Sequence, residues 1–185
     1  MKEREKILNV PNVLTMIRAL LIPVYWVLFM NGRHYIALAV FIVASLTDLL
    51  DGYIARKYHL ITNFGKLMDP LADKLMVLSV MLSLVIKEFV CWPPLAIILV
   101  KEALMVLGGA VMLKKGIVVY AEKIGKYAQA TTVLALVLSF FSKDAWFVSM
   151  GFPLHEVILW IAVALTLCAL CFYGRSAIQK LKALK

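Results

Sequence analysis

The chain is poor in the residues that build metal centres and disulfide frameworks from sulfur and imidazole. Its 185 residues include three cysteines and three histidines. Cys168 and Cys171 form a C-x-x-C pair inside an apolar segment, with no second pair and no nearby histidine. We therefore interpret them as small packing residues rather than as a zinc or redox site. The sequence also shows no internal repeat, no low-complexity segment and no cleavable signal peptide.

Charged residues are scarce as well, at 17% of the chain, whereas 63% of the residues are hydrophobic. Soluble domains are only about 45–50% apolar, so this composition excludes a soluble protein and predicts an integral membrane protein. Six apolar segments approach the ~20 residues that a helix needs to cross a bilayer. They cover Val13–Met30, Tyr35–Ile54, Leu67–Ile86, Pro94–Leu113, Ile124–Phe141 and Leu154–Tyr173.

The predicted fold is all-α: a polytopic membrane protein with six transmembrane helices in a single domain over residues 1–185. Short connections between the segments favour antiparallel packing of neighbouring helices. Residues 1–11 combine alternating charges with a closing proline. They are expected to form a short interfacial arm rather than a targeting signal.

Basic residues predict the orientation in the membrane. With the N-terminus inside, the outer connections hold only Arg33, Lys87 and Lys143. The inner face takes Lys2, Arg4, Lys6, Arg56, Lys57, Lys66, Lys114, Lys115, Lys123, Lys126, Arg175, Lys180, Lys182 and Lys185. This asymmetry places both termini in the cytoplasm. The net charge of +9 then fits anionic lipid headgroups and does not require a nucleic-acid partner.

Four aspartates lie inside or at the edges of two consecutive apolar segments. Asp48 and Asp51 are three residues apart, and Asp69 and Asp73 are four apart, so each pair shares one face of a predicted helix. An ionised carboxylate in hydrocarbon costs about 2.5–3.5 kcal/mol, and four kept together need compensating positive charge. Two antiparallel helices would bring them around a small cleft on the cytoplasmic side.

The simplest source of that charge is a pair of divalent metal ions. No histidine or cysteine joins the aspartates, and all-oxygen ligation favours Mg²⁺ or Mn²⁺ over zinc. Metal ions held by carboxylates usually handle phosphates. Two alternatives stay open: solvated interfacial charges, and a cation channel or proton relay. A channel would spread its carboxylates through the membrane depth, whereas these gather near one interface.

The aspartates belong to a longer pattern, D-x-x-D-G-x-x-A-R, then a spacer of eight residues, then G-x-x-x-D-x-x-x-D. This stretch resembles the motif of the CDP-alcohol phosphatidyltransferases. Every fixed position is matched: Asp48, Asp51, Gly52, Ala55, Arg56, Gly65, Asp69 and Asp73. The opening P-N-x-L-T-x-x-R, from Pro11 to Arg18, is similar to the bacterial phosphatidylglycerophosphate synthases of that family. So is the run from Thr62 to Lys74.

The resemblance implies the chemistry and the partners. The donor would be CDP-diacylglycerol, the acceptor glycerol 3-phosphate, and the enzyme a homodimer in the bacterial cytoplasmic membrane. Asp48, Asp51 and Asp69 would bind two metal ions. Asp73 would be the general base and would also touch a metal. The nucleotide pocket would be formed by Gly52, Ala55, Arg56 and Gly65.

The acceptor site is less well marked. Basic candidates are Arg18, Lys101 and Lys126, each with a structural alternative: snorkelling to headgroups for Arg18, an ion pair with Glu102 for Lys101, and a solvated position for Lys126. The chain has Val100-Lys101-Glu102 where the related synthases have A-R-E. Of their G-K-x-K-T run it keeps Gly125-Lys126-Tyr127, but Ala128-Gln129 replaces the second lysine and the threonine. A second acceptor therefore stays open: phosphatidylglycerol, which would give cardiolipin.

Overall fold

A computed structural model describes residues 9–58, 62–114 and 123–182. Inside these ranges the side chains of some helical residues, including Asp51, Gly52, Ala55 and Arg56, lie outside the description. The described helices are α1 Val10–Met30, α2 His34–Lys57, α3 Asn63–Ile86, α4 Pro93–Lys114, α5 Lys123–Ser139, α6 Ala145–Val148 and α7 Leu154–Lys182. The described ranges contain no strand, which confirms the all-α prediction.

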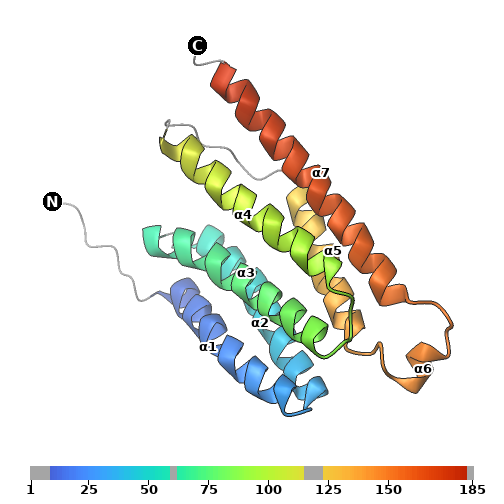
Figure 1. Ribbon diagram of the computed structural model, residues 1–185. Helices are drawn as coiled ribbons and strands as arrows, with labels where there is room; N and C mark the ends of the chain where they lie inside the picture. The colour runs from blue at the N-terminus through green and yellow to red at the C-terminus, as the bar shows by residue number, and fades with distance from the viewer. Residues whose placement is uncertain (1–8, 59–61, 115–122, 183–185) are drawn as a thin grey trace. The chain divides into compact units, whose positions relative to one another are not determined.

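The chain divides into two compact units, the first ending at Lys87 and the second beginning at Glu88. In the first unit, α1 packs against both α2 and α3, and α2 also contacts α3 (Figure 1). In the second unit, α7 packs against α5 and α4. Helix α1 is therefore the element that joins the two helices carrying the aspartates.

The first helix begins three residues before the predicted start at Val13. The side chain of Asn9 accepts a hydrogen bond from the Asn12 backbone N–H at 3.0 Å and so caps the helix. Pro11 lies in the first turn, where its missing N–H costs nothing. Of the expected interfacial arm, residues 10 and 11 belong to α1, and residues 1–8 lie outside the described ranges.

The core of the first unit changes from polar to apolar along α1. In its first half the buried residues include Asn12, Thr15 and Arg18, and in its second half they are Tyr25 and Phe29. Their rings stack with centroids 5.7 Å apart. The Tyr25 hydroxyl and the Ser83 hydroxyl of α3 lie 2.6 Å apart, and both side chains are fully buried.

In the second unit, Gly108 and Gly109 of α4 face Tyr173 of α7. A Cβ at Gly108 or Gly109 would lie 3.8 or 3.5 Å from the Tyr173 side chain, which is ordinary van der Waals distance. A Cβ would therefore fit at either position, so this contact between α4 and α7 does not require glycine. The connection from Ser142 to Pro153 contains the single-turn helix α6.

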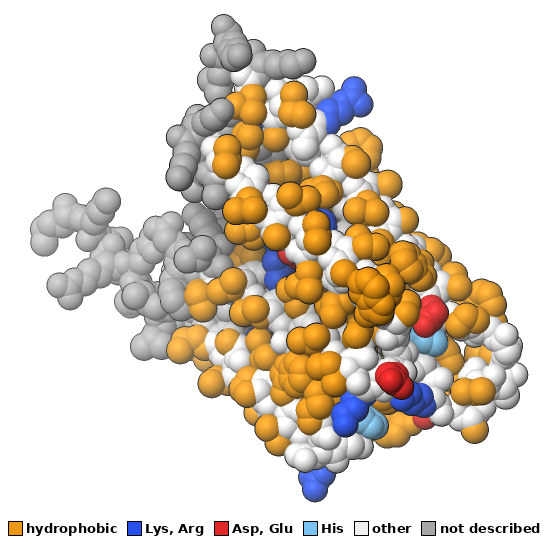
Figure 2. Space-filling view, viewed as in Figure 1, with side chains coloured by type: hydrophobic (Ala, Val, Ile, Leu, Met, Phe, Trp, Pro, Cys, Tyr) orange, Lys and Arg blue, Asp and Glu red, His pale blue; other side chains and the backbone are white. Residues whose placement is uncertain are grey.

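The exterior is largely apolar. On the face shown in Figure 2, hydrophobic side chains cover most of the described surface and charged side chains are few. Two described helices are long and apolar enough to cross a membrane, namely Val10–Met30 and Leu154–Leu181. In each, only 22% of the most apolar window is buried within the protein. Exposed apolar side chains in such quantity suit contact with lipid rather than with water.

Candidate functional site

The first half of α1 carries three buried polar side chains at intervals of three residues. Asn12, Thr15 and Arg18 are each at most 2% exposed, although the helix is otherwise apolar. Residues three apart lie on one side of a helix, so these form a polar stripe. Buried polar groups are destabilising unless they are paired. The stripe finds its partners on α2 and α3, among residues of the predicted phosphatidyltransferase motif.

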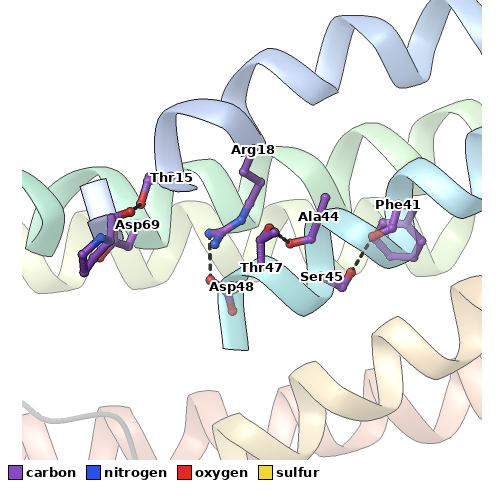
Figure 3. A network of polar contacts seen from close by, with 9 residues as sticks. Thr15, Arg18, Phe41, Ala44, Ser45, Thr47, Asp48 and Asp69 are labelled. Atoms are coloured by element: carbon purple, nitrogen blue, oxygen red, sulfur yellow. Dashed lines mark hydrogen bonds and ion pairs between the residues drawn. The ribbon is translucent and has the colours of Figure 1, made fainter. Parts of the chain in front are cut away.

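Arg18 pairs with the first aspartate of that motif. Its Nη1 donates to Asp48 Oδ1 at 2.7 Å, across α1 and α2 (Figure 3). The Arg18 side chain is 1% exposed and that of Asp48 is 35% exposed. Snorkelling of Arg18 to the headgroups was a structural alternative, and its burial excludes that. The contact instead places a positive charge beside a carboxylate that is only partly solvated.

Thr15 makes the corresponding contact to α3. Its hydroxyl is within hydrogen-bond distance of Asp69 Oδ1, and also lies 3.1 Å from the backbone carbonyl of Pro11 (Figure 3). A hydroxyl has one proton to donate, so these two oxygens compete for it. From α1, the Asp69 carboxylate is therefore contacted by a neutral group, the Thr15 hydroxyl, whereas the Asp48 carboxylate is contacted by a charged group, the Arg18 guanidinium.

Asn12 contacts the start of α3. Its side-chain Nδ2 donates to Thr62 Oγ1 at 3.0 Å, and Thr62 Oγ1 caps α3 by accepting from the Gly65 backbone N–H at 3.0 Å. A Cβ at position 65 would lie 2.7 Å from Asn12 Oδ1, 3.2 Å from Thr62 Oγ1 and 3.4 Å from Asp69 Oδ2. Gly65 is therefore required by close packing of polar side chains, next to the carboxylate of Asp69.

One carboxylate of each predicted pair contacts the first half of α1, Asp48 of α2 through Arg18 and Asp69 of α3 through Thr15. Asp48 and Asp69 are both partly buried and lie close enough to repel each other electrostatically. Asp73 follows one turn later on α3 and is also partly buried, whereas the Asp51 side chain lies outside the description. Among the side chains that are described, no three acidic, His or Cys groups meet as a ready-made metal site.

The donor chemistry nevertheless fits a hard divalent cation. Two neighbouring carboxylates with no described sulfur or imidazole donor beside them form an all-oxygen ligand set. Their mutual repulsion is relieved by a cation placed between them. The described residues thus offer oxygen atoms of the kind that a divalent cation takes as ligands, and the predicted ligands Asp51 and Asp73 would add to them.

The remaining predicted site residues divide by location. Gly52, Ala55 and Arg56 lie on the last turns of α2, and their side chains are outside the description. Lys101 and Lys126 belong to the second unit. Lys101 Nζ lies 2.6 Å from Glu102 Oε1, which is the ion pair considered as its alternative role. Lys126 is exposed on α5.

Sequence reasoning assigned no role to Asn12, Thr15 or Thr62, although they lie in the motif runs that carried the resemblance. One signal could have found the first two: polar residues at three-residue intervals, continuing to Arg18, in an apolar helix. Thr62 precedes α3 as a capping threonine, and its second contact, to Asn12, depends on a helix fifty residues away. Local pattern gives no indication of that contact.

Comparison with known proteins extends these observations to most of the chain. The sequence profile described as CDP-alcohol phosphatidyltransferase matches residues 8–168. A Bacillus subtilis protein named CDP-diacylglycerol–glycerol-3-phosphate 3-phosphatidyltransferase is 36% identical over 85% of this chain and 89% of its own length. Relatives with the same name from Rickettsia typhi and Pseudomonas fluorescens are 37% and 35% identical. They cover 86% and 95% of this chain, and 91% and 93% of their own lengths.

The match to the family profile includes α1 as well as the aspartate-bearing helices, so the buried contacts from Thr15 and Arg18 lie inside the matched region. The full motif, the paired carboxylates of α2 and α3 and the agreement along most of the sequence have one explanation: the chain belongs to the CDP-alcohol phosphatidyltransferase family.

Proposed function

We propose that this protein transfers the phosphatidyl group of CDP-diacylglycerol to glycerol 3-phosphate, giving phosphatidylglycerophosphate and CMP. One observation carries the proposal: relatives named for this reaction are 35–37% identical over 85–95% of the chain. The alternative of an ion channel or transporter has no comparable support. Phosphatidylglycerol remains the acceptor to be tested against glycerol 3-phosphate.

The four aspartates would divide the work. Asp48, Asp51 and Asp69 would hold two divalent ions, with Asp73 also in reach of a metal. The family uses divalent metal ions, and the oxygen ligands suit Mg²⁺ or Mn²⁺. When bound, the ions would neutralise the diphosphate of the donor and the charge that develops on the leaving phosphate.

Asp73 would act on the acceptor. As general base it would take the proton from the attacking hydroxyl of glycerol 3-phosphate. A bond then forms between that oxygen and the phosphorus attached to diacylglycerol, and the bond between this phosphorus and the CMP oxygen breaks. Its position one helical turn after Asp69, on the same face of α3, supports this assignment.

Nucleotide and acceptor would be held by the remaining motif residues. Gly52, Ala55, Arg56 and Gly65 would form the CDP pocket, where small residues let the nucleotide approach the helix backbone. Lys101 and Lys126 would bind the phosphate of the acceptor. Arg18, the third acceptor candidate, is buried beside Asp48, and its contact supports a different role, argued below.

The membrane arrangement is also a proposal. Helices α1 to α5 and α7 would each cross the bacterial cytoplasmic membrane, with both termini and the aspartates on the cytoplasmic side, and the enzyme would be a homodimer. The distribution of basic residues supports this orientation. Cysteine labelling in intact cells tests it, after Cys91, Cys168 and Cys171 have been replaced by serine. Asn31→Cys and Lys87→Cys, introduced one at a time at exposed positions, should both react with a membrane-impermeant maleimide from outside.

An acceptor assay tests the reaction. The purified protein in detergent is given CDP-diacylglycerol, Mg²⁺ and one alcohol at a time, and CMP and lipid products are quantified. We expect product with glycerol 3-phosphate, loss of activity in EDTA and recovery with added Mg²⁺. Product only with phosphatidylglycerol would make the protein a cardiolipin synthase. If CMP is released neither with glycerol 3-phosphate nor with phosphatidylglycerol, the proposed function is contradicted.

A further inference from the structure

Arg18 and Thr15, three residues apart on α1, each contact a carboxylate from a different helix. Arg18 contacts Asp48 on α2 and Thr15 contacts Asp69 on α3. We propose that Arg18 and Thr15 are positioning residues that orient the two metal-binding carboxylates, and that the Arg18 charge stabilises them while no metal is bound. This inference rests on the proposed function, since it takes Asp48 and Asp69 to be metal ligands.

Burial argues that Arg18 acts through Asp48 and not on the acceptor. A side chain that is 1% exposed cannot reach a phosphate arriving from water unless α1 moves away from α2. Its guanidinium is already engaged, because Nη1 donates to Asp48 Oδ1 at 2.7 Å. Asp48 is 35% exposed, so the carboxylate and not the arginine presents surface to a ligand.

The electrostatics give Arg18 a second task. Asp48 and Asp69 repel each other, and both are only partly solvated. In the metal-free protein the Arg18 charge offsets this repulsion, and it remains constant because a guanidinium does not lose its proton in proteins. A bound divalent cation offsets the same repulsion. Arg18 and the metal therefore stabilise one pair of carboxylates, and loss of Arg18 should be compensated in part by metal.

Thr15 can hold the Asp69 carboxylate in place without preventing that carboxylate from binding a cation. Its single hydroxyl proton has two acceptors, Asp69 Oδ1 and the Pro11 carbonyl oxygen. When Asp69 Oδ1 is engaged elsewhere, the hydroxyl can donate to Pro11 and remain satisfied inside the helix. Thr15 thus keeps the carboxylate in place before a cation arrives and leaves no orphaned buried donor afterwards.

The test uses the purified full-length protein and the variants Arg18→Gln and Arg18→Lys. Thermal unfolding is measured without metal and over a titration of Mn²⁺ alone, and CMP release is measured over glycerol 3-phosphate concentration. The matched control is Arg33→Gln, which removes an exposed arginine at the N-cap of α2, at the opposite end from Asp48. The wild-type reaction is run in parallel, so that failure of the proposed function itself is seen separately.

For Arg18→Gln we expect a metal-free Tm at least 5 °C below that of the wild type, and a rise in Tm with Mn²⁺ that clearly exceeds the wild-type rise. Its kcat should fall at least tenfold, while KM for glycerol 3-phosphate stays within twofold. Arg18→Lys, which keeps the charge but loses the planar fork, should recover part of both losses. Arg33→Gln should match the wild type throughout.

Either of two results for Arg18→Gln would overturn the inference. If Arg18→Gln raises KM for glycerol 3-phosphate tenfold and leaves kcat unchanged, Arg18 binds the acceptor. If its Tm falls but Mn²⁺ raises it no more than in the wild type, the ion pair is structural only. In either case the wild-type reaction still reports on the proposed function. If the wild type instead shows no turnover, the Mn²⁺ titration alone still decides between a positioning role and a purely structural role for Arg18.

Thr15 is tested with its own control. Thr15→Val keeps the shape of the side chain and removes the hydroxyl, whereas Thr15→Ser keeps the hydroxyl. Thr132→Val is the matched control, because Thr132 is buried and donates to the Ala128 carbonyl at 2.8 Å, in the same way as Thr15 can to Pro11, without a carboxylate. We expect kcat to fall severalfold only in Thr15→Val; equal activity in Thr15→Val and Thr132→Val would contradict a positioning role.

Discussion

The side-chain oxygen of Asn12 lies 2.7 Å from the place that a Cβ at position 65 would occupy. Non-bonded carbon and oxygen atoms do not approach this closely, so any residue larger than glycine at position 65 displaces Asn12. Asn12 is not free to move, because its amide donates to Thr62 Oγ1, which in turn caps α3. Residues of α1 and α3 thus pack with no spare volume beside Asp69.

Gly65→Ala should therefore destabilise the fold and impair the site together. Overpacking of this kind costs about 1–3 kcal/mol, and we expect a lower Tm and at least a tenfold loss of CMP release. Gly174→Ala is the control, because no atom lies within 4 Å of a Cβ at that position and alanine favours the helix. Wild-type Tm and activity in Gly65→Ala would show that α1 and α3 separate readily at this point.

Asp73→Asn should abolish turnover and leave a folded protein. The amide keeps the size of the side chain but cannot take a proton from the acceptor hydroxyl. CMP release should fall at least a hundredfold, with Tm within a few degrees of the wild type, as measured by an enzyme assay and thermal unfolding of the same preparation. Near-normal CMP release would mean that Asp73 is not the base.

Tyr25→Phe should reduce stability without affecting the reaction. The change removes a hydrogen bond between two fully buried hydroxyls, those of Tyr25 and Ser83. Ser83 also donates to the Val80 carbonyl at 2.7 Å, so it retains one partner. Hydrogen bonds between membrane helices contribute about 0.6 kcal/mol on average and up to about 1.7, and a loss in this range is expected.

A double-mutant cycle with Ser83→Ala measures that contribution in unfolding experiments. The coupling between the two substitutions should be nonzero, and kcat should stay within twofold of the wild type in all three variants. Additive losses of stability would mean that the two hydroxyls do not interact.

Cys91 should alkylate slowly at neutral pH. It lies in the connection between α3 and α4, and burial, followed by the Glu156 carboxylate, raises the pKa of its thiol above the ordinary value. The thiolate is the reactive form, so the rate with a water-soluble maleimide should climb only at alkaline pH. Glu156→Gln removes a charge that opposes ionisation and should shift the rate profile to lower pH.

The cysteine measurement needs a background in which Cys168→Ser and Cys171→Ser remove the two exposed thiols of α7. A model thiol in the same buffer gives the reference profile. A Cys91 profile identical to the reference, or unchanged by Glu156→Gln, would contradict the assigned environment.

Helix positions were largely predictable from hydropathy. The six apolar segments correspond to α1 to α5 and α7, because a run of apolar residues with short polar breaks allows little but helix in a membrane. The ends were less predictable. Helix α1 starts before its apolar run because Asn9 caps it, and α7 extends to Lys182, beyond the predicted Tyr173, because polar residues continue a helix past its apolar part.

The composition of the predicted site stays a prediction, and the residues that contact its aspartates were not foreseen from the sequence. The spacing of Asp48, Gly65, Asp69 and the other motif residues identified the family, which the comparisons confirm. The same spacing suggested that α2 and α3 face each other directly. In the structure α1 packs against both, and the contacts that hold Asp48 and Asp69 come from Arg18 and Thr15.

The sequence by itself determined which residues share a helix face, since helical periodicity assigns each side chain a direction around its own axis. It therefore specified which faces of α2 and α3 carry the aspartates, and the aspartate motif indicated the family. Only the tertiary structure decided that Arg18 meets Asp48 thirty residues away and that Thr15 meets Asp69 fifty-four residues away. The physical reason is that rotation about one helix axis says nothing about which neighbouring helix fills the space opposite it.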